Sequence, residues 1–356
     1  MTEAILKREE QAILTLRQLY RQYGYIPYKM SRFEEYDLYV RSKDFLVSDQ
    51  IITFSGDRGK LMALKPDVTM SIVKNAPEEP GVVQKVYYNE NVYRDYREIM
   101  QAGLECVGDL GSYEIAEVVL LAAKSLALLG EDYVLDISHM GLVSAALDSC
   151  GLEGEQKARA MDCLRRKNLH GLESLCPEHS WKLLTLAACH GSGRELLCKV
   201  RSVLETREEL LAWQELQDLV EMLEGSGFGS HVRLDFSVGN NMRYYSGVVF
   251  RGYLSGIHTS ILSGGQYDRL PRKLGRKAKA VGFAIYVDLL QELQDRENLF
   301  DVDTLILHDG TVDAKTLTAA AAGAAAGGTV LVAKQPPEGR SWKRLIRFEK
   351  GEAVIC

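Results

Sequence analysis

The chain has 356 residues, of which 46% are hydrophobic, and a formal net charge of −6 at pH 7. A chain of this length and composition can form one large domain with a satellite, or two domains. The net negative charge argues against a protein whose main role is to wrap nucleic acid, because phosphate contacts need clustered cations.

The sequence shows no sign of export, membrane insertion or metal binding. The opening MTEAILKREEQAILTLRQLY lacks the apolar region of a signal peptide, and no stretch is long and apolar enough to span a bilayer. Seven cysteines without a C-x-x-C pair indicate reduced thiols rather than a disulfide framework or a zinc site. The sequence therefore predicts a cytoplasmic protein with no metal and no cofactor.

An amphipathic helix is predicted first, over residues 3–23, because apolar residues such as Leu16 and Leu19 recur there at helical spacing. Short strands and two further helices follow it. In chain order they are strands 51–54 and 61–64, a helix that Pro66 opens and that runs to Lys74, strands 82–88 and 99–107, and a helix over 113–129.

Residues 141–228 are predicted to form a helical insertion, because Leu, Ala, Glu, Lys and Arg dominate and β-branched runs are missing. The glycine-rich EGSGFGS closes this insertion. Strands then resume, and the predicted elements are strands 232–236, 244–250, 258–263 and 281–285 and a helix over 288–293.

These elements predict an α+β fold. Strands outnumber crossover helices, which favours a mixed, largely antiparallel sheet flanked by helices over a doubly wound parallel one. We expect a core over residues 1–300, with the insertion at 141–228 inside it, and a small C-terminal α/β segment over 301–356. In that segment, strands 304–307 and 329–332 flank an Ala/Gly-rich helix.

The most informative stretch for function is REIMQAGLECVGD, residues 97–109. In a strand, Met100, Leu104 and Cys106 share an apolar face that belongs to the core. Gln101 and Glu105 share the other face, with a glycine between them that leaves room for a ligand. A face that simply looks at water is the alternative. A lining Glu favours an ammonium or imidazole ligand.

Other polar residues are candidates for the same pocket. Asp67 and Thr69 lie at a predicted helix start, where helix capping is the alternative role. Tyr244 and Tyr245 are expected on opposite sides of a strand, one in the core and one in the pocket. Tyr267 follows a Gly-Gly turn that lets the backbone approach a ligand closely. No dinucleotide fingerprint, P-loop, zinc-protease or G-x-S-x-G motif is present.

Five motifs in order resemble the catalytic core of histidyl-tRNA synthetase and its paralogues. They are LKPDVT, VYRDYREIMQAGLECVG, YYSGVVF, SGGQYD and AVGFAI, and the resemblance covers residues 1–295. It implies a class II aminoacyl-tRNA synthetase fold that is dimeric. It also implies a histidine pocket formed by Asp67, Thr69, Gln101, Glu105, Tyr244, Tyr245 and Tyr267.

The resemblance also shows where catalytic parts are altered. Synthetases carry an arginine before the paired tyrosines, where this chain has Asn240, and losing such a charge typically costs on the order of 100- to 1000-fold in rate. Only Asp95 and Tyr96 separate Arg94 from Arg97, where synthetases have a longer loop. Arg94 and Arg97 remain as possible phosphate or anion contacts. The C-terminal residues are too few for the usual anticodon-binding domain.

A core that keeps the amino-acid pocket without catalytic residues is similar to the regulatory subunit of ATP phosphoribosyltransferase. That resemblance implies a non-enzymatic subunit that binds L-histidine, activates and feedback-regulates a short catalytic subunit in the first step of histidine biosynthesis, and forms a homodimer within a hetero-oligomer. It argues against a tRNA partner. The alternatives are a diverged histidyl-tRNA synthetase, a free-standing amino-acid-activating paralogue, or a scaffold with a vestigial pocket.

Overall fold

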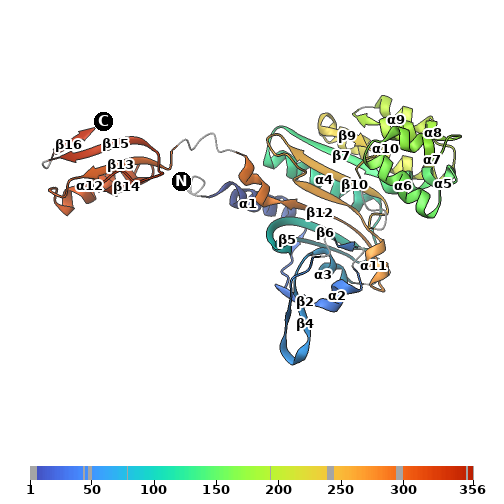
Figure 1. Cartoon of the computed structure of the whole chain (residues 1–356), viewed down its shortest axis with the longest axis horizontal. Coiled ribbons are helices and arrows are strands. Elements are labelled where there is room, and N and C mark those ends of the chain that lie inside the picture. The colour runs from blue at the N-terminus through green and yellow to red at the C-terminus, as the bar shows by residue number, and fades with distance from the viewer. Residues whose placement is uncertain are drawn as a thin grey trace. The chain divides into compact units, whose positions relative to one another are not determined.

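The computed structural model describes residues 6–42, 45–46, 50–77, 79–192, 194–238, 244–293, 300–349 and 352–355. The chain separates into two compact units, Met1–Glu292 and Leu293–Cys356 (Figure 1). None of the described helices is both long enough and apolar enough to cross a membrane.

The first unit contains most of the helices and strands. Its helices are α1 (Arg8–Gln22), α2 (Tyr36–Val40), α3 (Thr69–Lys74), α4 (Ser112–Leu129), α5 (Met140–Ser149), α6 (Gly154–Arg165), α7 (Leu169–Leu175), α8 (Ser180–Ala188), α9 (Arg194–Arg201), α10 (Arg207–Gly225) and α11 (Arg269–Lys273). Its strands are β1 (Ile26–Pro27), β2 (Phe33–Glu35), β3 (Thr53–Ser55), β4 (Leu61–Leu64), β5 (Val83–Arg94), β6 (Arg97–Gly108), β7 (Tyr133–His139), β8 (His190–Gly191), β9 (Val232–Asp235), β10 (Val248–Leu254), β11 (Leu262–Gln266) and β12 (Lys279–Tyr286).

A mixed sheet forms the centre of this unit. Its described strands run in the order β1-β5-β6-β12-β11-β10-β7-β9-β8, and a smaller sheet has the order β2-β4-β3. In the large sheet the described pairs β1/β5 and β7/β9 are parallel, and the others are antiparallel. The predicted α+β class with a largely antiparallel sheet is therefore confirmed.

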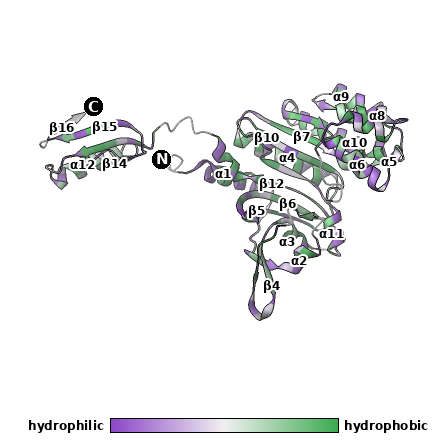
Figure 2. Ribbon diagram, viewed as in Figure 1, coloured by the Kyte–Doolittle hydropathy of each residue, from purple (hydrophilic) through white to green (hydrophobic). Residues whose placement is uncertain are grey.

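Helices α1 and α4 pack on one face of the sheet. Helix α4 is largely hydrophobic along its length (Figure 2), so it needs an apolar partner surface. Leu104 and Cys106 of β6 are fully buried, as the predicted alternation requires. Gly252 of β10 also faces α4, because a Cβ added there would lie 2.6 Å from the Leu126 side chain. The opposite face of these strands is left for a ligand site.

The helical insertion holds a buried ionic network. Lys182 of α8 is 1% exposed and donates to Glu209 (2.9 Å), Glu205 (3.0 Å) and Ser149 (2.8 Å). Glu209 also accepts hydrogen bonds from the backbone amides of Glu205 and Thr206, which form the N-terminal cap of α10. The network therefore joins α5, α8 and α10.

Strands β5 and β6 form a hairpin with a two-residue turn. Arg94 pairs with Arg97, so Asp95 and Tyr96 alone form the turn, as the sequence predicts. Both turn residues have positive φ, 51° and 61°. Two such residues are typical of a type I′ turn, which matches the twist of the strands.

We expect Tyr96→Gly to stabilise the protein. A left-handed conformation costs a residue with a side chain about 1–2 kcal/mol, which glycine avoids, although glycine also gains freedom in the unfolded chain. Tyr96 is 84% exposed, so little buried surface is lost. The net gain should be about 0.5–1 kcal/mol in urea unfolding. A loss of stability would mean that the Tyr96 ring makes a stabilising contact.

Some predicted boundaries are wrong. The strand predicted at 244–250 begins only at Val248, and Tyr244 lies in a turn before it. The helix predicted from Pro66 begins at Thr69, since the residues before it form a bend that presents their side chains. The strand predicted at 258–263 is β11, Leu262–Gln266.

The second unit is a small α/β structure, and its described strands form one sheet. The elements are β13 (Val302–His308), α12 (Ala314–Ala325), β14 (Val330–Ala333), β15 (Trp342–Glu349) and β16 (Glu352–Ile355), in the sheet order β14-β13-β15-β16. Strands β13 and β14 are parallel with α12 between them, as predicted. Ile306, Ala324 and Phe348 form its core. Strands β15 and β16 were not predicted.

Candidate functional site

A pocket of about 530 Å³ opens on the face of the sheet opposite α4. Residues from β6, β10, β11 and β12 form its floor, and segments before α3 and β10 form its walls. We call it the sheet pocket. Its lining residues are Phe45, Leu46, Asp67, Thr69, Tyr88, Arg94, Gln101, Glu105, Tyr244, Tyr245, Val249, Arg251, Ser260, Ser263, Gly264, Tyr267, Gly282, Phe283, Ala284 and Tyr286.

Glu105 is the buried carboxylate of the sheet pocket. Its side chain is held at both oxygens, because Thr69 donates to Oε1 at 2.7 Å and the Tyr267 hydroxyl donates to Oε2. Gly282, on the neighbouring strand, is needed here, since a Cβ at that position would lie 1.7 Å from Glu105 Oε2. The carboxylate is thus fixed over a strand that has no side chain in its way.

Burial raises the pKa of Glu105 to about 8. The hydrogen bonds from Tyr267 and Thr69 act in the opposite direction, since they favour the ionised form. The charge of nearby Asp67 adds a further rise. A cationic ligand would offset the free-energy cost of burying the ionised carboxylate. The site is therefore suited to a group that brings positive charge or an N–H donor.

Asp67 forms both a helix cap and part of the pocket wall. Its Oδ1 accepts from the Met70 amide at 2.9 Å, which satisfies the start of α3. Its Oδ2 lies 3.5 Å from an Arg94 guanidinium nitrogen, and Arg94 also donates to the Pro66 carbonyl at 2.6 Å. Burial raises the pKa of Asp67, and the Arg94 charge opposes that rise. The capping and pocket roles proposed as alternatives therefore coexist.

Three tyrosines form an aromatic wall. The Tyr244 ring centroid lies 4.8 Å from that of Tyr245 and 5.4 Å from that of Tyr267. Burial raises the pKa of Tyr245 to about 12 and raises the pKa of the other two well above the usual value, so all three hydroxyls stay protonated at neutral pH. Tyr244 and Tyr245 both line the pocket because they precede β10, so the prediction that one lies in the core is wrong.

Gln101 faces the same pocket with an unused donor. The residue is 2% exposed, and its amide nitrogen has no hydrogen-bond partner among the described residues. A buried donor without a partner costs free energy, which a ligand acceptor would relieve. The alternative that this strand face looks at water is therefore wrong.

The structure brings the predicted site residues together, with one exception. Asp67, Thr69, Gln101, Glu105, Tyr244, Tyr245 and Tyr267 all line the sheet pocket, as does Arg94. Arg97 is exposed at the hairpin and is not a lining residue. Asn240, where synthetases carry an arginine, lies outside the described residues.

The lining residues that sequence reasoning missed include Phe45, Arg251, Ser263 and Tyr286. Alternation along β10 places Arg251 on the same face as Val249, so the strand pattern could have identified Arg251 as a pocket residue. Tyr286 lies just beyond the strand predicted at 281–285. Phe45 comes from a distant segment, and its ring lies 5.8 Å from that of Tyr244.

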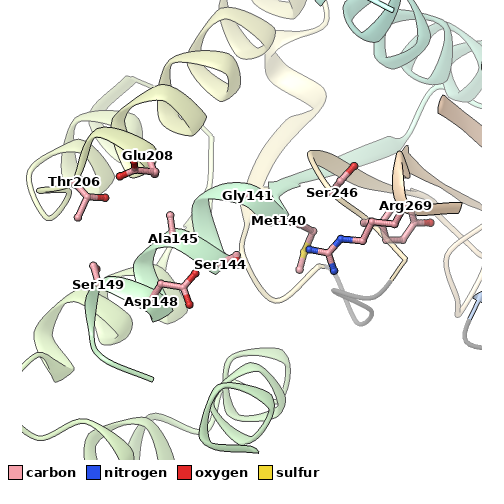
Figure 3. A pocket seen from close by; sticks show the side chains of 11 residues that line it. Met140, Gly141, Ser144, Ala145, Asp148, Ser149, Thr206, Glu208, Ser246 and Arg269 are labelled. Atoms are coloured by element: carbon pink, nitrogen blue, oxygen red, sulfur yellow. The ribbon is translucent and has the colours of Figure 1, made fainter. Parts of the chain in front are cut away.

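A second cavity of about 480 Å³ adjoins the first. Figure 3 shows Thr206 and Glu208 on one side and Arg269 on the other, with residues of α5 between them. Tyr245 lines both cavities, so its side chain is a shared wall. Asp148 in this second cavity is already paired with Lys157 at 2.5 Å. The unused donor of Gln101 makes the sheet pocket the better candidate for a ligand site.

Comparisons with known proteins agree with the motifs. A family model described as histidyl-tRNA synthetase matches residues 1–290. A curated relative from Clostridium kluyveri, an ATP phosphoribosyltransferase regulatory subunit, is 28% identical over 315 residues, which cover 83% of this chain and 80% of the relative. The predicted resemblance to such regulatory subunits is confirmed.

Solved structures give the same fold. An ATP phosphoribosyltransferase regulatory subunit/histidyl-tRNA synthetase from Bacillus halodurans superposes with a TM-score of 0.76 at 25% identity, covering 96% of this chain and 93% of that one. A chain of an ATP phosphoribosyl transferase complex from Thermotoga maritima gives a TM-score of 0.61 at 17% identity, covering 78% of this chain and 97% of that one. The predicted class II synthetase-like fold is confirmed.

Proposed function

This chain belongs to the histidyl-tRNA synthetase family, and we propose that it binds L-histidine and regulates a short-form catalytic subunit of ATP phosphoribosyltransferase. Its role is that of a regulatory, non-catalytic subunit, as in the curated relatives. The proposed partner carries out the first step of histidine biosynthesis, and histidine reports back to it as a feedback inhibitor.

The observation that carries the histidine proposal is the geometry around Glu105. A fixed buried carboxylate beside three tyrosine rings suits a flat ring that donates an N–H, which an imidazole is. Asp67, Thr69 and the unpaired Gln101 amide add polar groups for the remainder of an amino acid. Regulation requires that histidine bind two states of the assembly unequally, since equal binding shifts neither.

Reconstitution with the short catalytic subunit tests the regulatory proposal. We expect this chain to stimulate ATP phosphoribosylation, and added L-histidine to reverse the stimulation. Full stimulation that histidine leaves unchanged would contradict the feedback role. If a competent catalytic subunit is not stimulated at all, the proposed partnership is wrong.

The pH dependence of binding distinguishes which part of histidine meets Glu105. If the imidazole does, the bound pair shares one proton. Affinity should then rise up to about pH 6.5, where free imidazole loses its proton, and stay level to about pH 8. Above pH 8 it should fall up to tenfold per pH unit, because Glu105 of the empty pocket is then ionised and a proton must be taken up. Calorimetric titrations across this range measure the profile.

The opposite orientation gives a different curve. If the ammonium group meets Glu105, binding releases the Glu105 proton, and affinity should keep rising until about pH 8. A maximum reached only at pH 8 would therefore contradict the imidazole orientation while leaving histidine as the ligand.

An amino-acid-activating enzyme is the alternative that the family raises. The two-residue β5–β6 turn leaves Arg94 engaged with Pro66 and Asp67 rather than in an open loop. We therefore expect no histidine-dependent exchange of pyrophosphate into ATP. Exchange at rates typical of a synthetase would overturn the regulatory proposal.

We also propose that the chain forms a homodimer within the assembly. The small sheet exposes apolar side chains, with Phe33 45% exposed and Phe54 38% exposed, and these two rings lie 5.1 Å apart. Exposed aromatic residues side by side are typical of contact surfaces. Light scattering after gel filtration measures the mass of the particle, and a monomer at micromolar concentration would contradict this proposal.

A further inference from the structure

Arg251 of β10 is a cation of the sheet pocket that has no hydrogen-bond or ion-pair partner among the described residues. Gly252, the next residue, faces α4, so Arg251 faces the opposite side of the sheet and lines the pocket. Its guanidinium forms no hydrogen bond or ion pair with any residue that the structure describes. A partly buried guanidinium without an acceptor is poised for an anionic ligand group.

The other arginine of the sheet pocket, Arg94, is already engaged. Arg94 is held by Pro66 and Asp67, so it is the less available of the two lining arginines. Asp136 lies directly opposite Arg251 in the register of β7 and β10, yet forms no ion pair with it. Burial raises the pKa of Asp136, and the charge of Asp235 on β9 adds to that rise.

The register of the strands sets Arg251 across the pocket from Glu105. One row of cross-strand partners runs through Glu105, Gly282, Gly265 and Val249, and the next row on the same face runs through Gly103, Ala284, Ser263 and Arg251. Strands β6 and β10 are three strand spacings apart, about 14 Å at the backbone.

The residues between these two charged groups are small. They are Gly282 and Gly265 of one row with Ala284 and Ser263 of the other, so the floor of the pocket is low between strands β6 and β10. Glu105 and Arg251 thus lie at the two ends of a floor of small residues, which suits a small ligand with an N–H donor at one end and an anionic group at the other.

Two hydroxyls lie at the Arg251 end. Ser263 is its cross-strand neighbour on β11, and the Ser263 side chain is a hydrogen-bond partner of the Tyr245 hydroxyl. The Tyr245 ring lies against Gly265, where a Cβ would be 2.8 Å from it. Hydroxyls can donate to an anion, so this end offers several donors around one cation.

We propose that Arg251, with Ser263 and Tyr245, binds the α-carboxylate of the amino-acid ligand in the sheet pocket. This inference rests on the proposed function and adds to it a residue for the end of the ligand remote from Glu105. A guanidinium can hold a carboxylate through two parallel hydrogen bonds, which a lysine ammonium cannot reproduce. Loss of such a charge-assisted contact should cost about 10- to 100-fold in affinity.

The test compares L-histidine with L-histidinol, in which the carboxylate is replaced by a hydroxymethyl group. We expect the wild-type protein to bind L-histidine about 10- to 100-fold more tightly than L-histidinol. Arg251→Gln should bind both equally, at the wild-type affinity for histidinol. Arg251→Lys should keep part of the preference, and it provides a second variant if the first does not fold. Arg159→Gln, on the exposed side of α6, is the control and should behave as wild type.

The outcomes separate this inference from the proposed function. If the wild-type protein binds no L-histidine, the proposed function fails and the inference with it. If it binds L-histidine but prefers it over histidinol equally in the Arg251 variants, only the inference fails. Titration with inorganic phosphate is the last arm, and a loss of phosphate binding in Arg251→Gln with the histidine preference unchanged would assign the arginine to phosphate instead.

Discussion

Glu105→Gln should weaken L-histidine binding by about 100-fold, which corresponds to the upper range for a charge-assisted hydrogen bond. The substitution keeps the shape of the side chain and removes its charge, while Thr69 and Tyr267 remain in place to contact it. The fall in affinity above about pH 8 should also vanish, because the group that titrates there is gone. Calorimetric titration at several pH values measures both effects.

Glu98→Gln is a matched control on the same strand. Glu98 is exposed near the β5–β6 turn, where Asn91 and Tyr93 donate to it, and it does not line the sheet pocket. We expect its histidine affinity to equal that of the wild type. Equal loss in both variants would point to a general electrostatic effect, and unchanged binding in Glu105→Gln would show that another carboxylate holds the ligand.

Lys182→Met should destabilise the protein by about 3–5 kcal/mol, because it leaves a buried carboxylate without its cation. Glu209 is fully buried, and Lys182 is its ion-pair partner. The methionine fills a similar volume, so lost charge rather than a cavity dominates the effect. Urea unfolding at pH 7 measures the loss.

Two further variants isolate the cause. Lys157→Met removes a partly exposed pair with Asp148 in the same insertion, and pairs of that kind are worth about 0–1 kcal/mol. Lys182→Met combined with Glu209→Gln removes the unpaired charge and should recover part of the stability. A loss as large in Lys157→Met as in Lys182→Met would contradict the importance of burial.

The same network predicts that the stability of the protein depends on pH in the acidic range. Burial raises the pKa of Glu209, but hydrogen bonds from Lys182, Ser149 and two backbone amides outweigh burial and lower it below its usual value. A carboxylate with a lowered pKa stabilises the fold above its unfolded pKa, about 4.3, and this contribution is lost as the pH falls through the folded value. The difference in unfolding free energy between the wild type and Lys182→Met should therefore become smaller in acid, where Glu209 becomes protonated.

Much of the candidate site could be predicted from local pattern. Alternation along 97–109 placed Gln101 and Glu105 on one face and Leu104 on the other, and the structure has this arrangement. The period of a strand is two, so a single correct residue fixes the face of all the others. Thr69 was a candidate from a predicted helix start and Tyr267 from a Gly-Gly turn, and the structure places both within hydrogen-bonding distance of Glu105.

The remainder depended on contacts between distant segments. Tyr244 and Tyr245 were placed in the strand predicted at 244–250, but the chain turns there and both residues line the pocket. Phe45 reaches the site from a segment about two hundred residues earlier, and no local pattern indicates such a contact. Lys182 reads as an ordinary helix-surface lysine, and only the packing of α5, α8 and α10 shows that it is buried.

The two-residue turn between β5 and β6 also limits how this part of the chain can change in length. A deletion would force the strands to slip by one residue, which would carry Glu105 into the core and bring Leu104 to the pocket. An insertion is tolerated far better, since each doubling of a flexible loop costs only about 0.6 kcal/mol. This hairpin should therefore accept a longer connection between Arg94 and Arg97 more readily than the loss of a single residue.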